Sequence, residues 1–416
     1  MKKIIIRLVG FVSFKVAKIL QRFNILITIY SDMFGHQAWN IEYHIRRYIK
    51  KHNKFPKLIG VQSTSLIPNL GLYRHHKAYG ITILPPKGLV STFFKLGMTY
   101  QKNLSNGRDI NSLESSVFAI TTMDNIFGED SDILLNGNVA MPLTESEIIE
   151  ANNFLDKYNL KKGEYICFMD RDGAYMKSKS EESINLNNKD DSFIIREYNV
   201  NKGENIYDYS RNTELNLYYK GIKELNKVGI KSVRYGASSN NRCTNNLVLD
   251  YSFEIRSRDY DINDLYLMDN CKFYIGPPSG DEVLAMAFNK PICSINSFPW
   301  PYINIPYRAD SMHVPQKLWI KKEKRFMKLS EMAVLEIKYK RIDFVSGFAQ
   351  HELGFEPVKN SEEEIAKVIM EMNDRIDGVW DTERDVFNKY LTNNNISFSS
   401  KAILSTAFME MNTDIL

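Results

Sequence analysis

The sequence predicts an α/β protein built from two Rossmann-like, doubly wound domains that face each other across a cleft. Short apolar runs alternate with longer polar stretches in both halves of the chain, as expected when strands alternate with helices. A length of 416 residues suits two large domains. The composition, 44% hydrophobic and 25% charged, is that of a protein with a buried core. It excludes a disordered chain, a collagen-like repeat and a disulfide scaffold.

Positive charge is concentrated at the front of the chain. The whole sequence has a net charge of +4, yet residues 1–60 hold twelve Lys and Arg against two acidic residues, Asp32 and Glu42. The remaining 356 residues carry a net charge of −6. A basic front end on a mildly acidic body suggests a docking segment on an otherwise soluble protein, and nothing indicates a nucleic-acid partner.

The cysteines show no metal-binding or redox spacing. Neither a CxxC motif nor a Cys/His ligand pattern occurs among the four of them, Cys167, Cys243, Cys271 and Cys293. We therefore expect free thiols, mostly buried, in a protein of the reducing cytosol.

Residues 1–23 are predicted to form an amphipathic helix. The longest uncharged run lies between Arg7 and Lys15 and has only seven residues, which is too short to span a bilayer. No small-residue cleavage site follows it, which argues against a secretory signal. One interpretation is a helix in the headgroup region of an anionic membrane, on the inner face of the cytoplasmic membrane. The other is a first helix packed on the body with its lysines in solvent; the wide apolar sector favours the membrane.

The first domain is predicted to span residues 24–150. It opens with a strand at 24–30, a turn, and a helix from about 37 to 50, followed by apolar runs at 58–61, 81–84 and 116–120. Near its end, Thr144 and Glu147 have the spacing of a capping box at the start of a helix.

The second domain is predicted to span residues 151–384. Strands are expected at 164–169, 230–236, 272–276 and 292–296, with helices at about 211–227, 261–269 and 281–288. A polar insertion at 177–192 is expected to be a mobile loop. Ser361 and Glu364 form a second capping box on a helix to about residue 375. A final helix over 385–416 could pack back on the first domain.

A glycine turn after the strand at 272–276 indicates a phosphate site. Gly276 and Gly280 let the backbone approach a ligand, Ser279 adds a hydroxyl, and a helix with free N–H groups follows. The alternative is a plain glycine turn with a serine cap. Gly236, at the end of another strand, is a second and weaker turn of this kind.

The loop after the first strand of the second domain contains charged residues. Asp170 and Asp172 have the spacing of a DxD metal site, but Arg171 between them opposes a cation. We expect no metal here, and expect Arg171 to contact a phosphate or carboxylate.

In the first domain, Gly35 and His36 are expected to end the loop after the first strand, with Asn40 and Glu42 following on the helix. A histidine titrates near neutral pH, so His36 is a candidate general base. The alternative is a histidine with a purely structural hydrogen-bonding role.

Several of these segments, in this order, resemble a bacterial family of GT-B-like glycosyltransferases encoded among surface-polysaccharide (capsule and O-antigen) genes. The matching segments are GHQAWNIEYHIR (35–46), CFMDRDGAYMKSK (167–179), VRYGA (233–237), DLYLMDNCKFYIGPPSG (264–280), NKPICSINSFPW (289–300), ADSMHVPQKLWIKKEKRFMKLSEM (309–332) and NSEEEIAKVIMEM (360–372). The resemblance covers most of residues 24–380. The sequence departs from it at two prolines before Ser279, at Gln316 in place of a Lys, and at Leu284, where many retaining enzymes have a ribose-binding Glu.

The resemblance implies a glycosyltransferase that uses a nucleotide-sugar donor without a metal or cofactor. The second domain would hold the donor, and the first would face a glycan or lipid-linked acceptor through Gly35, Asn40 and Glu42. His36 or Asp172 would deprotonate the acceptor hydroxyl. The donor residues would be Arg171, Gly236, Gly276, Ser279, Gly280 and Glu282. The alternatives are a pyruvyltransferase, a nucleotide-sugar epimerase, or a glycan-assembly protein that binds without catalysis.

Overall fold

The structure, a computed structural model, describes residues 2–104, 118–119, 138–174, 211–236, 239–255, 262–298, 308–338, 348–386, 388–389 and 402–416. It divides into two compact units. Unit 1 comprises Met1–Leu155, Ser257–Tyr266 and Met286–Asn289, and unit 2 comprises Asp156–Arg256, Leu267–Ala285 and Lys290–Leu416. The polar insertion predicted at 177–192 lies outside the described residues.

Unit 1 is built on a parallel sheet of four strands in the order β3-β2-β1-β4. The strands are β1 (Ile25–Tyr30), β2 (Lys57–Gln62), β3 (Thr82–Leu84) and β4 (Phe118–Ala119). All four fall on apolar runs that predicted strands. From β1 the chain proceeds to β2 and β3 on one side, and β4 then pairs on the other, so the direction of winding reverses at β1.

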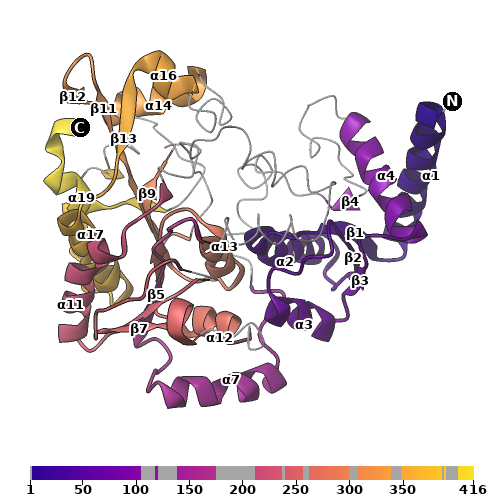
Figure 1. Cartoon of the computed structure of the whole chain (residues 1–416), viewed down its shortest axis with the longest axis horizontal. Helices are drawn as coiled ribbons and strands as arrows, with labels where there is room; N and C mark the ends of the chain where they lie inside the picture. Colours follow the sequence, from indigo (N-terminus) through magenta and orange to yellow (C-terminus); the bar gives the residue numbers. More distant parts are fainter. Residues whose placement is uncertain are drawn as a thin grey trace. The chain divides into compact units, whose positions relative to one another are not determined.

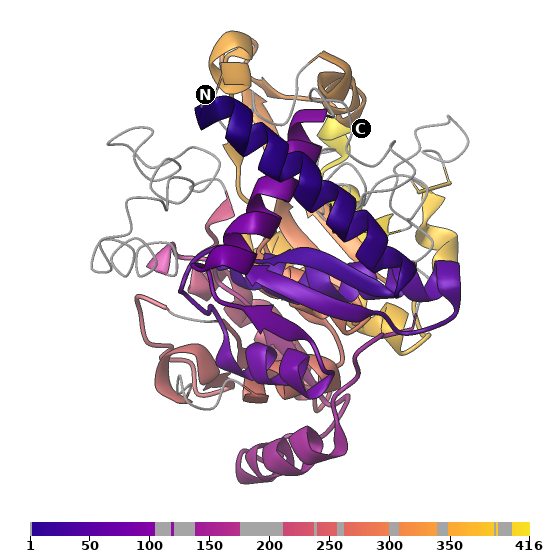
Figure 2. The same cartoon turned by 90° about the vertical axis from the view of Figure 1, so that its right-hand side faces the viewer.

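Helices cover both faces of this sheet. Helices α1 (Lys2–Arg22) and α4 (Leu89–Leu104) form one core, in which Ala17 and Phe94 pack against Ile27. Helices α2 (Phe34–His52) and α3 (Leu70–Ala78) belong to the opposite side, where Ile41 packs with Leu26. Unit 1 is therefore doubly wound, and Figure 2 shows α1 as the outermost helix over α4.

Helix α7 (Glu145–Lys157) begins at the predicted capping box. The Thr144 N–H donates to Glu147 Oε2 at 2.8 Å, and the Glu147 N–H donates to Thr144 Oγ1 at 3.4 Å. Glu147 also bonds His75 Nδ1 at 3.0 Å, which ties α7 to α3. The same carboxylate thus caps one helix and anchors another.

Unit 2 is built on a parallel sheet of seven strands in the order β14-β10-β9-β8-β5-β6-β7. Figure 1 labels β5, β7 and β9 of this sheet. These strands are β5 (Tyr165–Phe168), β6 (Lys231–Arg234), β7 (Val248–Asp250), β8 (Tyr274–Gly276), β9 (Ile292–Ser297), β10 (Met312–Pro315) and β14 (Ile403–Leu404). Every pairing in it is parallel. The chain runs outward from β5 through β6 and β7, then outward from β8 in the other direction, so the topological switch point lies between β5 and β8.

Helices also cover both faces of the second sheet. On one face Phe168 of β5 belongs to the core formed with α11 (Tyr219–Lys227) and α17 (Glu362–Ile376). Gly221 of α11 allows this packing, since a Cβ there would lie 2.5 Å from Ile369 Cδ1. On the other face the Tyr165 hydroxyl donates to the carbonyl of Leu267 in α12 (Ile262–Asn270). Successive side chains of β5 thus point to opposite faces of the sheet, and both faces are buried.

The predicted helix starts and turns in unit 2 are largely confirmed. Ser361 and Glu364 form a complete capping box at the start of α17. The helix expected at 211–227 consists of a short 3₁₀ turn, η1 (Leu215–Tyr218), followed by α11. The structure describes the other short helices as α13 (Gly280–Ala287), α14 (Leu329–Lys338), α16 (Phe348–Leu353), the π-helical η2 (Tyr251–Ile255) and η4 (Thr382–Arg384).

The C-terminal residues differ from the predicted helix over 385–416. Residues 402–416 belong to unit 2, where β14 pairs with β10 and α19 (Thr406–Met411) packs on α17. A final turn, η5 (Thr413–Ile415), ends the chain. Ser405 caps α19 and donates its hydroxyl to Glu371 of α17 at 2.6 Å. The buried carboxylate of Glu371 thus anchors this segment within unit 2.

A small antiparallel sheet in the order β12-β11-β13 completes unit 2, with β11 (Lys317–Ile320), β12 (Arg325–Phe326) and β13 (Phe355–Val358). All four cysteines are buried and free, as predicted. None of the helices in the described part of the chain is long and apolar enough to cross a membrane.

Candidate functional site

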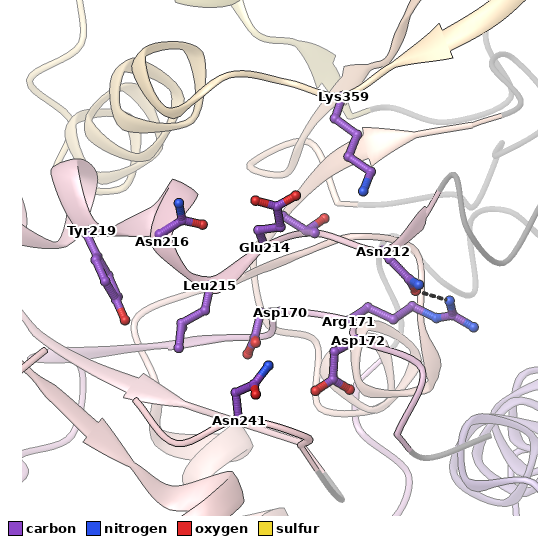
Figure 3. A pocket seen from close by; sticks show the side chains of 11 residues that line it. Asp170, Arg171, Asp172, Asn212, Glu214, Leu215, Asn216, Tyr219, Asn241 and Lys359 are labelled. Atoms are coloured by element: carbon purple, nitrogen blue, oxygen red, sulfur yellow. Dashed lines mark hydrogen bonds between the residues drawn. The ribbon is translucent and has the colours of Figure 1, made fainter. Parts of the chain in front are cut away.

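A pocket of about 370 Å³ opens at the carboxyl edge of the seven-stranded sheet of unit 2 (Figure 3). In parallel α/β sheets this edge, beside the switch point, is where ligands bind. The walls are formed by the loops after β5 and β6, by the segment that leads through η1 into α11, and by Lys359 directly after β13. The lining residues are Asp170, Arg171, Asp172, Asn212, Thr213, Glu214, Leu215, Asn216, Tyr219, Asn241 and Lys359.

Arg234 of β6 holds the floor of the pocket together. Its side chain is fully buried, and Nε and Nη2 each donate to one oxygen of Asp170 at 2.7 Å. Nη1 donates to the Asn241 carbonyl at 2.5 Å and to Asp250 Oδ2 at 3.3 Å. Burial raises the pKa of Asp170, while Arg234 opposes that shift. One guanidinium therefore joins the loops that follow β5 and β6 to the end of β7.

Arg171 and Lys359 supply the positive charge of the pocket. Arg171 Nη1 donates to Asn212 Oδ1 at 2.7 Å, and its carbonyl accepts the Thr213 N–H at 3.0 Å. Figure 3 shows both cationic side chains on the side away from Tyr219. The predicted role of Arg171 as an anion contact fits this position, whereas nothing in the sequence singled out Lys359.

Tyr219 and Leu215 supply the less polar side of the pocket (Figure 3). Burial, together with a hydrogen bond to Cys243, raises the pKa of Tyr219 to about 12, so its hydroxyl stays neutral. The pocket is therefore polarised, with an aromatic wall at one end and two cations at the other.

Asp172 is occupied by backbone amides. Oδ1 accepts the Ala174 N–H at 3.0 Å and Oδ2 accepts the Asn240 N–H at 2.5 Å. Both carboxylate oxygens are therefore engaged by the backbone. In this arrangement Asp172 orders the two loops that border the pocket.

The glycine turn lies beside β5, at the switch point. A Cβ on Gly276 would lie 2.6 Å from the Tyr274 hydroxyl and 3.3 Å from the Met169 carbonyl, so only glycine fits. The Tyr274 hydroxyl lies 3.2 Å from Ser279 Oγ, which accepts the Glu282 N–H and so caps α13. The serine cap of the alternative interpretation is therefore present, and Gly280 begins the helix.

Two further residues join this turn to the loop after β5. Gly236 has a positive φ of 143°, which favours glycine. A Cβ at this position would lie 3.9 Å from Met169 Cγ and 3.9 Å from Asp281 Oδ2. Arg211 Nη1 donates to the Pro278 carbonyl at 3.1 Å. Sequence reasoning missed Arg211, which follows the long polar insertion without any motif around it. The structure thus brings the predicted turns at Gly236 and Gly276 together around β5.

Glu282 is completely buried beneath the glycine turn. Within the described part of the chain, neither carboxyl oxygen has a hydrogen-bond partner of ordinary geometry. Burial raises the pKa of Glu282 to about 8, so the side chain is neutral at pH 7. It does not line the pocket, in contrast to the predicted direct contact with a donor.

In unit 1, His36 is exposed and lies in the first turn of α2, near the carboxyl end of β1. The prediction placed Gly35 and His36 at the end of a loop, whereas the helix already begins at Phe34. Sequence reasoning missed Asp32, whose Oδ2 accepts the Thr64 hydroxyl at 3.1 Å at the same edge. The end of β1 is also the point where the winding of this sheet reverses.

The Glu42 side chain is buried and hydrogen-bonded within unit 1. It is 2% exposed, accepts Arg46 Nε at 2.6 Å, and accepts the N–H groups of Ala140 and Met141. Its oxygens are therefore engaged by donors within the unit. Asn40, on the same helix, is half-buried.

The described residues contain no group of three or more His, Cys, Asp or Glu side chains that could hold a metal ion. Asp170 of the DxD pattern is committed to Arg234, and Asp172 to backbone amides. These two carboxylates are therefore not arranged to share a cation.

Comparison with known protein families finds no matching family model, and no curated protein matches the chain. Among solved structures, the glycosyl transferase family 9 from Veillonella parvula DSM 2008 aligns with a TM-score of 0.42 and 11% identity. The alignment covers 84% of this chain and 96% of that chain. A likeness of this size assigns no family, so the residues of the pocket carry the functional argument.

Proposed function

We propose that the protein is a glycosyltransferase that binds a nucleotide-sugar in the pocket of unit 2. The sugar would pass to a growing cell-surface glycan or a lipid-linked acceptor. The observation that carries the proposal is the polarised pocket at the switch point, bounded by Tyr219 and Leu215 at one end and by Arg171 and Lys359 at the other.

The polarity of the pocket matches the polarity of a nucleotide-sugar. A planar base would lie against Tyr219, and the phosphates would meet Arg171 and Lys359. Asn216 and Glu214 offer amide and carboxylate groups to the hydroxyls of a ribose. A guanidinium binds phosphate oxygens in pairs, which gives Arg171 the stronger orienting role.

The chemistry proposed for this site uses no metal or cofactor. When the glycosidic bond to the donor breaks, negative charge grows on the leaving phosphate, and Arg171 and Lys359 would stabilise it. The residues at the start of α13 do not line the pocket, so their amides would add to this stabilisation only for phosphates that extend beyond it. Because Glu282 is neutral at pH 7, it adds no charge beneath that helix end.

The acceptor hydroxyl needs a base, and we assign this role to His36. Its side chain is exposed at the edge of the unit 1 sheet, and a histidine accepts protons near neutral pH. Asp172, the other candidate, is held by two amide donors and is assigned to loop ordering.

A donor hydrolysis assay over UDP-, GDP- and CMP-sugars tests the proposal. We expect release of the nucleotide from one class of donor, and unchanged rates in excess EDTA. His36→Ala should abolish transfer while leaving nucleotide binding intact, and Asp172→Asn should lower the melting temperature as well as activity. Binding without turnover of any donor would indicate a glycan-assembly binding protein. Turnover with phosphoenolpyruvate, or interconversion of free nucleotide-sugars, would reassign the protein to a pyruvyltransferase or an epimerase.

A further inference from the structure

Helix α1 has an exposed apolar surface that the fold of unit 1 leaves uncovered. Seven aliphatic or aromatic side chains on the outward side are between 39% and 72% exposed. Six belong to the helix, and Phe23 follows it directly: Ile4, Ile5, Leu8, Phe11, Val12, Ile19 and Phe23. With 3.6 residues per turn, these positions fall on one broad stripe, which we call the α1 stripe. Single exposed apolar residues are common on protein surfaces, but a continuous stripe of this size marks an interaction site.

The helix is nevertheless firmly packed on its other side. It meets α4 through small residues, Gly10, Ser13 and Ala17, all of them buried. The approach is very close, since a Cβ on Gly10 would lie 2.8 Å from the Leu96 carbonyl and one on Gly97 would lie 2.3 Å from Ser13 Oγ. The packed side of α1 also includes the partly buried Phe14 and Leu20, while the side chains of the α1 stripe remain exposed.

Positive charge lies among and beside the side chains of the α1 stripe. The basic residues of the helix are Lys2, Lys3, Arg7, Lys15, Lys18 and Arg22, and the first acidic residue of the chain is Asp32. Lys18 lies at the edge of the stripe, whereas Lys15 and Arg22 fall within the same side of the helix, toward its C-terminal end, and all three are exposed. Lys15 also lies with its ammonium 5.3 Å from the ring centre of Phe11, so its stem follows the apolar surface.

We propose that the α1 stripe docks unit 1 on an anionic lipid bilayer, with α1 lying in the plane of the headgroups. Apolar side chains enter the boundary between headgroups and acyl chains, while the flanking cations meet lipid phosphates. Lipid fits better than a protein groove, because exposed apolar side chains occur near both ends of the helix, with cations among and beside them and no acidic residue. The helix does not span the bilayer, in agreement with its hydropathy.

Flotation of the full-length protein with lipid vesicles tests this surface. We expect binding to vesicles of phosphatidylcholine and phosphatidylglycerol, little binding to phosphatidylcholine alone, and release in high salt. In Lys15→Gln/Lys18→Gln/Arg22→Gln the affinity should fall about 100-fold, since each cation near an anionic surface contributes about fivefold.

Two matched variants separate the stripe from general apolar exposure. Ile4→Ser/Leu8→Ser/Ile19→Ser should weaken binding at least about tenfold. The control, Val228→Ser/Val379→Ser/Val386→Ser, removes side chains of similar exposure, 56% to 71%, from unit 2 and should bind normally. Nucleotide binding should be equal in all variants, so that a failure here is distinct from a failure of the glycosyltransferase proposal.

Three results would overturn the membrane assignment. These are no flotation of the wild-type protein with anionic vesicles, equal flotation of the wild-type protein and the stripe variant, or equal affinity for neutral and anionic vesicles. Self-association that the stripe variant abolishes, without vesicle binding, would reassign the surface to a second copy of this chain.

Discussion

Replacing Glu282 with glutamine should make unit 2 more stable at alkaline pH. The carboxyl is completely buried beneath the glycine turn, and burial raises its pKa from 4.5 to about 8. The folded protein therefore holds a proton that the unfolded chain releases between these two values. Stability must fall as pH rises through this window, and is lowest above the folded pKa.

The size of the effect follows from the shift. Each pH unit within the window changes the free energy of unfolding by about 1.4 kcal/mol, so the full window amounts to about 5 kcal/mol. Glutamine has the same shape and cannot ionise. The difference in stability between Glu282→Gln and the wild type should therefore grow from pH 5 to pH 8 and then level off.

Urea unfolding at half-unit steps from pH 5 to pH 9 measures this difference. Comparing two proteins cancels the contributions of buried histidines such as His44 and His313, whose pKa values burial lowers to about 3 and about 4. The exposed Glu150→Gln is the matched control and should track the wild type. A constant difference between Glu282→Gln and the wild type across the range would refute the buried, protonated carboxyl.

Three further substitutions test other parts of the structure. Arg234→Met leaves Asp170 as a buried carboxylate without its partner and should destabilise unit 2 by about 3–5 kcal/mol in urea unfolding at pH 7. Gly276→Ala forces a methyl group against the Tyr274 hydroxyl and should cost about 1–3 kcal/mol, with weaker nucleotide binding by calorimetry. Although burial opposes it, hydrogen bonds lower the pKa of Glu147, so Glu147→Gln should remove stability at pH 7 and flatten the loss seen on acidification.

Each of these predictions has a result that contradicts it. An Arg234→Met protein as stable as the exposed-surface control Lys223→Met would show that the guanidinium does not fix the loops. For Gly276→Ala, the double variant with Tyr274→Phe should recover part of the lost stability, and no recovery would place the clash elsewhere. If the free energies of unfolding of Glu147→Gln and the wild type fall in parallel as the pH is lowered, the Glu147 carboxylate is not the titrating group.

Local signals in the sequence predicted much of the framework. The strands β1, β2 and β5 fall on short, mainly apolar runs, because strands buried on both faces leave few polar positions. Ser361 caps the start of helix α17 as predicted, because a capping box involves only residues three positions apart. Such elements depend on residues close in the sequence, so they can be predicted without knowledge of the fold.

Features that depend on distant residues were not predictable in this way. The pairing of β14 with β10 joins residues 403–404 to residues 312–313, and no local pattern records it. Glu42 drew attention as a site residue, although Arg46 four positions later is the signal of a helical ion pair. The guanidinium of Arg234 was overlooked. An Arg at the end of one strand, with Asp170 and Asp250 at the ends of the two neighbouring strands, is the signal of a buried ion-pair network.

Titration calorimetry with nucleotides tests the central claim most directly, namely that the pocket of unit 2 binds a nucleotide-sugar. One nucleotide class should bind the wild type at a single site, with affinity reduced at least about tenfold in Arg171→Gln and in Lys359→Gln, since each removes a charge-assisted contact to phosphate. The exposed control Lys223→Gln should bind as the wild type does. No binding of any nucleotide, or binding that both pocket variants retain in full, would contradict the account.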